Sequence, residues 1–274
     1  MFRCAMSGAL LTALFSIIWK GTATAAVMVS AGRLALRLGP ILTGVLISIP
    51  LNAGPGFFIL SFDVDAAFLS TAGLFGFAVA GPVLIFSALT ARLLLITSLL
   101  PALLGGLAAW AAGVWLLTLL PMTIWLACLS IIVSALLSWR LGRLPASTPE
   151  IKQVDVPAGW RFLLLRSAIA GGVIASVATV GPYLAPFWSG LLFGFPTTLC
   201  ANLWMLNGHY GRVFAARTLL ASRINQSAYA TLCLVLWLGD GLLPPTLGVV
   251  VAFLAGMSVA GLVAIILHRQ RSAE

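Results

Sequence analysis

The sequence predicts an all-α integral membrane protein with about nine transmembrane helices. Low charge, long apolar segments and a repeated motif all favour this class. Hydrophobic residues make up 61% of the 274 residues, charged residues 8%, and the mean hydropathy is +1.13. A soluble domain carries roughly 25% charged residues, so this chain lacks the polar surface that contact with water requires. Segments of about 20 apolar residues indicate helices, because membrane β-strands are about half that length and alternate strictly.

Apolar segments that fit membrane-spanning helices follow one another along the chain. Only Pro121 marks the boundary between the fourth and fifth segments, and it suits the first turn of a helix because its missing N–H costs nothing there. A polar linker follows. We therefore divide the chain into a first four-helix repeat (1–118), a connector helix (119–139), a cytoplasmic linker (140–160) and a second four-helix repeat (161–274). The predicted spans are about 5–29, 39–61, 67–90, 94–118, 120–139, 162–180, 183–206, 219–239 and 245–267.

A motif with helix-breaking residues occurs twice. Residues 39–50 (GPILTGVLISIP) align without a gap on residues 185–196 (APFWSGLLFGFP), 146 positions later. Each copy holds two prolines, a central glycine and a hydroxyl side chain. A duplicated break inside an apolar chain is typical of transporters built from two repeats. The alternative is an old duplication that is retained only for packing.

Basic residues indicate the orientation of the helices. With the N-terminus outside and the C-terminus in the cytoplasm, twelve of the fifteen Lys and Arg residues fall on the inner side, as the enrichment of basic residues in cytoplasmic loops requires. Corresponding helices of the two repeats are then separated by an odd number of membrane crossings, so they cross the membrane in opposite directions. The two four-helix repeats therefore have inverted topology, and the connector helix joins them. The outer turns hold Arg3 and the acidic Asp63, Asp65 and Asp240. The inner residues are Arg33, Arg37, Arg92, Arg140, Arg143, Lys152, Arg161, Arg212, Arg217, Arg223, Arg269 and Arg271.

The repeated motif has a physical consequence for the backbone. Pro50 and Pro196 each remove a backbone donor and displace the carbonyl four residues earlier. In lipid such freed groups must face protein or a watery cavity, so two breaks near the middle of the membrane can bind a polar solute. The alternative is a kinked helix whose small residues allow a tight helix–helix contact. The candidate substrate-binding residues at the two breaks are Gly44, Ser48, Pro50, Asn52, Gly190, Gly194, Pro196, Thr197 and Thr198.

Two basic residues inside apolar segments also align at the 146-residue offset. They are Lys20 and Arg166. A cation at the centre of a lone helix costs about 3 kcal/mol on insertion scales, so it normally faces a partner or a cavity. Lys20 is therefore a candidate for binding an anionic group. Arg166 lies close enough to Arg161 to extend to the membrane interface, which is the alternative for both residues.

No cofactor, metal site or catalytic constellation is predicted. Asp63-Val64-Asp65 matches paired acids that hold a divalent metal in membrane glycosyltransferases, but an acidic outer turn explains it more simply. The histidines and cysteines have no metal-ligand spacing, and no basic cluster with interleaved aromatic residues suggests nucleic-acid binding. We expect a protein that is not an enzyme.

The second half of the chain resembles a known family. The residues that carry the resemblance lie within 186–267: Ser189-Gly190-Leu191-Leu192, Phe195-Pro196-Thr197, Gly208, Gly211, Arg217-Thr218, Ser227 and Tyr229. They are similar to the GlpM-like family of small, four-helix bacterial inner-membrane proteins. The first half keeps Gly44 and Pro50 but has Leu51 after the proline, so the chain resembles a fused, diverged duplicate. The resemblance implies the bacterial inner membrane and an association with exopolysaccharide production.

Two functions follow as expectations. The first is an inner-membrane transporter or flippase for a small or lipid-linked anionic solute, which binds between the two broken helices. The second is a non-transporting accessory or scaffold subunit of an envelope polysaccharide system, with partner proteins in envelope biosynthesis. A polar cavity at the two motifs favours the first, and motifs packed dry beside an apolar docking patch favour the second.

Overall fold

The computed structural model describes residues 53–143 and 175–272, together with Ile18, Thr22, Ala168, Gly171 and Gly172. All regular elements in these ranges are helices. Five helices are long and apolar enough to cross a membrane, which confirms the predicted all-helical class. These are Ala66–Ile96, Leu99–Thr118, Ile124–Leu141, Pro186–Gly208 and Pro245–Val263. Most of the predicted spans 5–29 and 162–180 and the start of the span 39–61 lie outside the described residues.

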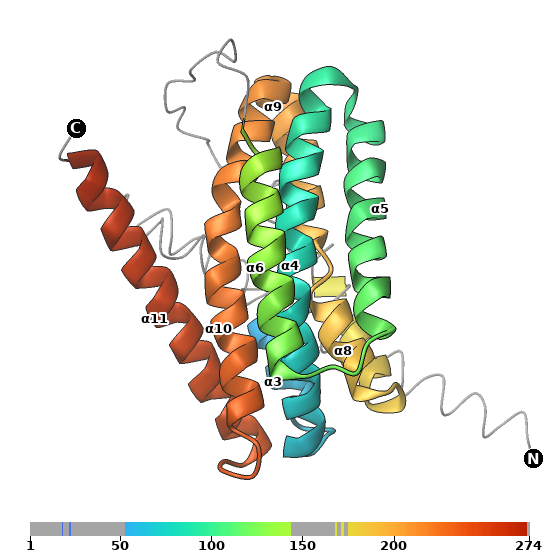
Figure 1. Cartoon of the computed structure of the whole chain (residues 1–274). Helices are drawn as coiled ribbons and strands as arrows, with labels where there is room; N and C mark the ends of the chain where they lie inside the picture. The colour runs from blue at the N-terminus through green and yellow to red at the C-terminus, as the bar shows by residue number, and fades with distance from the viewer. Residues whose placement is uncertain are drawn as a thin grey trace, which may run out of the picture.

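Helix α4 is the central element of the bundle (Figure 1). It runs from Ala66 to Ile96, and α5 (Leu99–Thr118), α6 (Ile124–Leu141) and α10 (Asn225–Leu238) pack around it. Its beginning is fixed by Asp65, whose carboxylate accepts a hydrogen bond of 2.8 Å from the Phe68 backbone N–H. Asp65 therefore serves as a helix N-cap on a turn.

A proline inside α4 is accommodated by its two neighbouring helices. Pro82 has no N–H to donate to the carbonyl of Ala78, so this carbonyl needs another donor. The Ser130 hydroxyl of α6 supplies it, donating to the Ala78 carbonyl at 3.0 Å. On the other side, Gly113 of α5 gives room to the proline ring, because a Cβ there would lie 3.1 Å from its Cγ. Pro82 thus lies between α6, which supplies the missing hydrogen-bond donor, and α5, which leaves space for the ring.

The short helix α6 begins later than the sequence suggests. Pro121 was expected in its first turn, but α6 begins at Ile124. Thr123 is the N-cap, and its hydroxyl accepts a 3.3 Å hydrogen bond from the Leu126 N–H. The physical reason is that the hydroxyl of an N-cap residue accepts a hydrogen bond from a free N–H group of the first turn. A proline in the first turn only lacks such an N–H group and satisfies none of the others.

Helix α9 (Thr197–Ala221) contains a reversal of the chain. Gly211 has φ 80° and ψ 170°, a conformation that side chains with a Cβ rarely adopt. Residues before and after it face each other, since Asn202 and Thr218 line the same pocket. We call 197–210 and 212–221 the first and second arms of α9.

The second arm of α9 continues into α10 as one helical rod. Ala221, Ser222 and Ile224 all keep right-handed helical dihedrals through the 3₁₀ turn η2 (Ser222–Ile224). The rod spans residues 212–238, so the predicted span 219–239 begins too late. The span was predicted from hydropathy, and Arg212 and Arg217 lower the hydropathy of this part of the helix. Arginine is nevertheless a good helix former, so the helix continues through both residues.

The rod lies antiparallel to α4 along its length. Near one end the Ser70 hydroxyl donates to the Trp237 carbonyl at 3.1 Å. Near the other end, Ala91 of α4 belongs to the same buried cluster as Ala215 of the second arm. α4 and the rod therefore form an antiparallel pair of long helices at the centre of the bundle.

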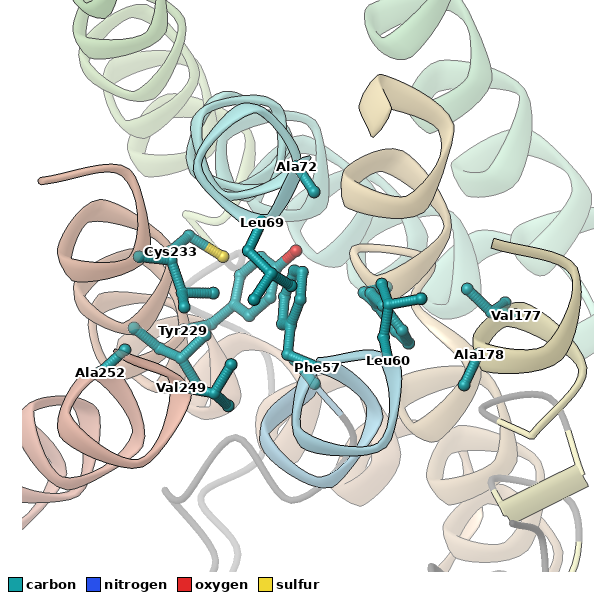
Figure 2. Close-up of a cluster of buried hydrophobic side chains, with 14 of the residues drawn as sticks. Phe57, Leu60, Leu69, Ala72, Val177, Ala178, Tyr229, Cys233, Val249 and Ala252 are labelled. Atoms are coloured by element: carbon teal, nitrogen blue, oxygen red, sulfur yellow. The ribbon is translucent and has the colours of Figure 1, made fainter. Parts of the chain in front are cut away.

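Three helices complete the described fold. α3 (Ala53–Leu60) precedes α4, and α8 (Pro186–Phe193) follows a 3₁₀ turn, η1 (Gly181–Tyr183). α11 (Pro245–Ser272) packs against α10 and against α3, where Gly54 contacts the Phe253 ring. A buried cluster joins α3, α4, α10 and α11, as Figure 2 shows.

Charge is divided between the two ends of the bundle. Asp65 precedes α4 and Asp240 follows α10, so both lie at the end where the rod finishes. At the opposite end lie the last turn of α4 with Arg92, the end of α6 with Arg143, and the reversal followed by Arg212. The grouping of these residues agrees with the one inferred from the sequence.

Candidate functional site at the interruption between α8 and α9

A membrane-length apolar segment is interrupted at the second copy of the motif. α8 ends at Phe193 and α9 begins at Thr197, so Gly194, Phe195 and Pro196 form the interruption. Pro196 has no N–H, and the carbonyl that would accept from it, Leu192, accepts instead from the Phe195 N–H at 3.1 Å. The predicted span 183–206 is therefore two helices joined by a three-residue break.

The break lies beside the middle of α4. Gly190 packs directly on the α4 backbone, because a Cβ there would overlap the Ala72 carbonyl and lie 2.9 Å from the Gly76 nitrogen. One turn later, Gly194 lies against the Val79 side chain, and Val79 is close to the centre of the 31-residue helix. Two glycines thus seat α8 on α4 so that the break falls near mid-height of the bundle.

Two buried hydroxyl groups lie at this seat. Ser189 has no hydrogen-bond partner among the described residues, and Tyr229 has the thiol of Cys233, a weak hydrogen-bonding group, beside it. Ser189 is 0% exposed, and its Oγ would lie 3.0 Å from a Cβ at Gly181. Tyr229 is 7% exposed, and its hydroxyl lies between Gly194 and Gly76, 3.1 and 3.0 Å from where their Cβ atoms would stand. Figure 2 shows the Tyr229 oxygen directed from α10 towards α4. A buried unpaired polar group costs about 1–3 kcal/mol, so the Ser189 hydroxyl favours a water or a solute beside it.

Aromatic side chains and an amide complete the surroundings. The Trp110 ring of α5 packs edge-on against the Phe195 ring, with centroids 5.0 Å apart. The Trp110 indole N–H and the Asn202 side-chain oxygen are also buried without a partner in the described structure. The break is therefore bordered by the Trp110 ring of α5 and the Tyr229 hydroxyl of α10, and Asn202 lies further along α9 in the pocket between its two arms.

The structure brings five of the predicted site residues together. Gly190 and Gly194 pack on α4, Pro196 is the N-cap of α9, and Thr197 and Thr198 form its first turn. The Thr197 hydroxyl donates to the Phe195 carbonyl at a long 3.5 Å. The other five predicted site residues, Lys20, Gly44, Ser48, Pro50 and Asn52, lie outside the described residues, as does Arg166.

Sequence reasoning missed two residues of this site. Trp110 was not singled out, and Tyr229 entered only through the family resemblance. Both are far from the motif in sequence and reach it through the packing of α5 and α10. A tyrosine hydroxyl and an indole N–H inside apolar helices are the only local signal, because both groups seek a polar partner when buried.

The chemistry of the break is that of a donor-rich, uncharged site. The N-terminus of α9 points its N–H groups and the positive end of its dipole at the break. The hydroxyls of Ser189 and Tyr229 and the indole N–H of Trp110 can each donate. Such a set suits an anionic or hydroxyl-bearing solute.

Comparison of the chain with protein-family models, with curated proteins and with solved structures finds no match. The fold and the site therefore define a class only, an all-helical protein with several membrane-length apolar helices, one of them interrupted at mid-height.

Proposed function

We propose that this protein is an inner-membrane transporter or flippase for a small or lipid-linked anionic solute. The observation that carries the proposal is the break at Pro196, which lies beside the middle of α4 next to the buried hydroxyls of Ser189, which has no partner among the described residues, and Tyr229, which has a weak thiol partner. A helix broken near the middle of the membrane, with helix ends aimed at a polar ligand, is the arrangement by which several transporters bind their substrates.

We further propose two inverted-topology four-helix repeats joined by a connector helix, α6. The 146-residue offset of the motif also relates helix starts, which supports this layout. α4 begins at Ala66 and the rod continues from residue 212 after Gly211, while α5 begins at Leu99 and α11 at Pro245. Each pair of starting positions differs by the same 146 residues.

The antiparallel pairing of α4 with the rod supports an inverted relationship. If the two are equivalent helices, an operation that exchanges them must reverse their direction. A two-fold axis perpendicular to both helices does this, and such an axis lies in the membrane plane when the helices run along its normal. The contacts of α3 with α11 and of α9 with α5 are consistent with the same operation.

The distribution of charge supports the proposed orientation. Arg92, Arg143 and Arg212 lie at one end of the bundle, and Asp65 and Asp240 lie at the other. With the arginine end in the cytoplasm, the N-terminus is outside and the C-terminus inside. Arginines at the cytoplasmic end and the positive end of α9 at the break both favour an anionic solute.

A scaffold function is the second candidate, and one surface favours it. The hairpin between α5 and α6 exposes Leu119, Leu120 and Trp125, the last being 82% exposed. Lipid covers such residues in a transporter, whereas a partner protein covers them in an accessory subunit of an envelope polysaccharide system. The resemblance to the GlpM-like family suits either function.

Thiol accessibility at the break separates the two functions. In a variant without native cysteines, Thr197→Cys should react with a membrane-impermeant maleimide added to cells, and also with one added to inverted vesicles. Ser87→Cys is the matched control, because Ser87 is fully buried on α4 and bonded to the Val83 carbonyl. Asp240→Cys and Arg143→Cys are controls for sidedness. Asp240→Cys should react with the reagent added to cells, and Arg143→Cys should react with the reagent added to inverted vesicles. A Thr197→Cys protein that is as inert as Ser87→Cys from both sides would exclude a solute path and favour the scaffold.

A further inference from the structure

We propose that the C-terminal end of α6 binds the phosphate of an anionic phospholipid. Trp139, Arg140 and Arg143 at the end of α6 and Arg223 of η2 form this headgroup site, and an acyl chain lies along the exposed apolar face of α6. The inference requires a lipid bilayer around α6, but it does not require transport at the break.

Arg223 brings a guanidinium group from the rod to the end of α6. Its Nη1 donates to the Ser138 carbonyl at 2.7 Å and to the Ser138 hydroxyl at 3.1 Å, and its Nε donates to the Leu220 carbonyl at 2.9 Å. Gly142 leaves room for the group, because a Cβ there would lie 2.5 Å from Nη1. Two donors remain on Nη2, which bonds no atom of the described residues. The guanidinium is therefore held in place while one edge stays available to a ligand.

No carboxylate of the described residues neutralises Arg223. The acidic residues in the described ranges are Asp63, Asp65 and Asp240, and they lie at the other end of the bundle. The C-terminus of α6 supplies only about half a negative charge through its helix dipole. Part of the arginine charge thus remains uncompensated, and a phosphate oxygen that accepts from Nη2 would compensate it.

Arg143 and Trp139 extend the site on α6. The Arg143 guanidinium carbon lies 3.8 Å from the centroid of the Trp139 ring, one turn earlier in the chain. Stacking engages the face of this planar group, so its N–H donors remain at the edge, where a phosphate can accept from them. Arg140 lies in the last turn of α6, and all three side chains are exposed. Exposed tryptophans and arginines are both typical of the headgroup level of a membrane.

The face of α6 that leads to this end is apolar. Leu129, Ile132 and Leu136 are each more than half exposed. With Trp139 they follow steps of three and four residues, which places all four on one face of the helix, in line with the stacked Arg143. From Leu129 to Trp139 this row is about 15 Å long, which matches one leaflet of a hydrocarbon core about 30 Å thick. The row therefore fits an acyl chain whose phosphate lies at the arginines.

The combination of an apolar row and arginines selects the occupant. Free phosphate gains nothing from the apolar row, whereas a phospholipid contacts both the row and the arginines. A zwitterionic headgroup carries its own ammonium group beside the phosphate, which weakens its attraction to the arginines. Basic pockets between membrane helices bind anionic headgroups for the same reason. The site therefore favours a lipid of net negative charge.

Lipid retention by the purified full chain tests the site. Protein in detergent is titrated with phosphatidylglycerol or with phosphatidylcholine, and native mass spectrometry measures the lipid that stays bound. We expect phosphatidylglycerol to bind about tenfold more tightly, and Arg143→Gln to weaken its binding about fivefold, as one arginine at a headgroup should. Arg212→Gln is the matched control, because Arg212 is exposed at the same end of the bundle and the substitution removes the same charge. It should bind like the wild type.

A charge-conserving variant tests Arg223. Arg223→Lys keeps the positive charge and a donor for the Ser138 carbonyl, but it loses the planar edge that presents Nη2. We expect weaker binding of phosphatidylglycerol, whereas Arg212→Lys should bind like the wild type. Thermal unfolding without lipid shows that both proteins are folded before the comparison is made.

Tryptophan fluorescence locates the bound lipid. Equimolar phosphatidylglycerol with brominated acyl chains should quench the wild type more than the Trp139→Phe variant, because Trp139 lies at the proposed site. Trp125→Phe is the matched control, since Trp125 is 82% exposed at the other end of α6. Its quenching should equal that of the wild type. Brominated phosphatidylcholine should not distinguish the three proteins.

The outcomes are separate from those that test transport. Equal retention of the two lipids by the wild type, or Arg143→Gln protein that binds phosphatidylglycerol as tightly as Arg212→Gln protein, would overturn the site. Displacement of phosphatidylglycerol by excess inorganic phosphate would assign the arginines to free phosphate and overturn the lipid. None of these substitutions lies at the break, so labelling of Thr197→Cys decides transport whatever the lipid result.

Discussion

The Tyr229 hydroxyl lies against Gly194, the residue that ends α8 at the break. A Cβ on Gly194 would stand 3.1 Å from this oxygen, and the same oxygen lies equally close to Gly76 of α4. The glycines leave room for this buried hydroxyl, whose partner among the described residues is the Cys233 thiol of α10. A thiol is a weak hydrogen-bonding group, so the hydroxyl either stays dry beside it or gains a water or a solute as a stronger partner, and the two cases have different energetic consequences.

Tyr229→Phe discriminates between these consequences. If a water or solute pairs with the hydroxyl, its removal should lower the free energy of unfolding by about 1 kcal/mol. If the site is dry, removing a hydroxyl whose only partner is the weak Cys233 thiol should change the free energy of unfolding little. We expect the loss, measured by unfolding in detergent micelles. Tyr183→Phe is the control because Tyr183 is largely exposed, and it should change little.

Gly190→Ala should disturb the seat of α8. The new methyl group would overlap the Ala72 carbonyl of α4, and overpacking of this kind typically costs about 1–3 kcal/mol. Gly208→Ala adds the same methyl group where no atom lies within 4 Å, so it should be neutral or slightly stabilising. Thermal unfolding of the two purified variants compares them directly. Equal stability of the two variants would refute the close contact between α8 and α4.

Ser130 and Pro82 should be coupled although they do not bond each other. Ser130→Ala removes the donor to the Ala78 carbonyl, which Pro82 leaves without its helical partner. An interhelical hydrogen bond in a membrane protein contributes about 0.6 kcal/mol on average and at most about 1.7. In a Pro82→Ala background the helix supplies its own N–H, so Ser130→Ala should then cost less. A double-mutant cycle of unfolding free energies measures the difference, and additive effects would contradict this account.

Reporter fusions test the orientation. The division of charge predicts that a fusion after Asp65 lies outside the cytoplasm and one after Arg143 lies inside. Alkaline phosphatase should therefore be active only at the first position, and green fluorescent protein should fluoresce only at the second. Fluorescence of green fluorescent protein fused after residue 65 would place this residue in the cytoplasm and remove the basis for an inverted arrangement of the repeats.

Much of the helical framework follows from apolar length alone. The predicted segment 67–90 falls within α4, and 94–118 ends with α5 at residue 118, because uninterrupted apolar sequence near membrane length leaves no other backbone solution in lipid. The boundary between the two segments was placed too early, because α4 continues past Arg92 to Ile96 and α5 begins at Leu99. The start of the rod at residue 212 was missed, because Arg212 and Arg217 reduce hydropathy without interrupting the helix. Hydropathy reports burial in lipid, whereas helix continuity depends on backbone dihedrals.

The candidate site was only half predictable for a related reason. Gly190, Gly194 and Pro196 are visible in the sequence, since glycine and proline act on their own backbone. Tyr229 and Trp110 reach the break from helices that are distant in sequence, and their roles depend on how α5 and α10 pack around α4. Pairwise packing of this kind leaves no periodic signal in a single sequence.

An experimental structure of the whole chain in a lipid bilayer tests the central proposal most directly. The measurement is the rotation that superposes residues 53–118 on residues 199–264. The account predicts a rotation near 180° about an axis in the membrane plane, with the breaks at Pro50 and Pro196 facing each other beside Tyr229. An axis along the membrane normal, or halves that do not superpose, would contradict it.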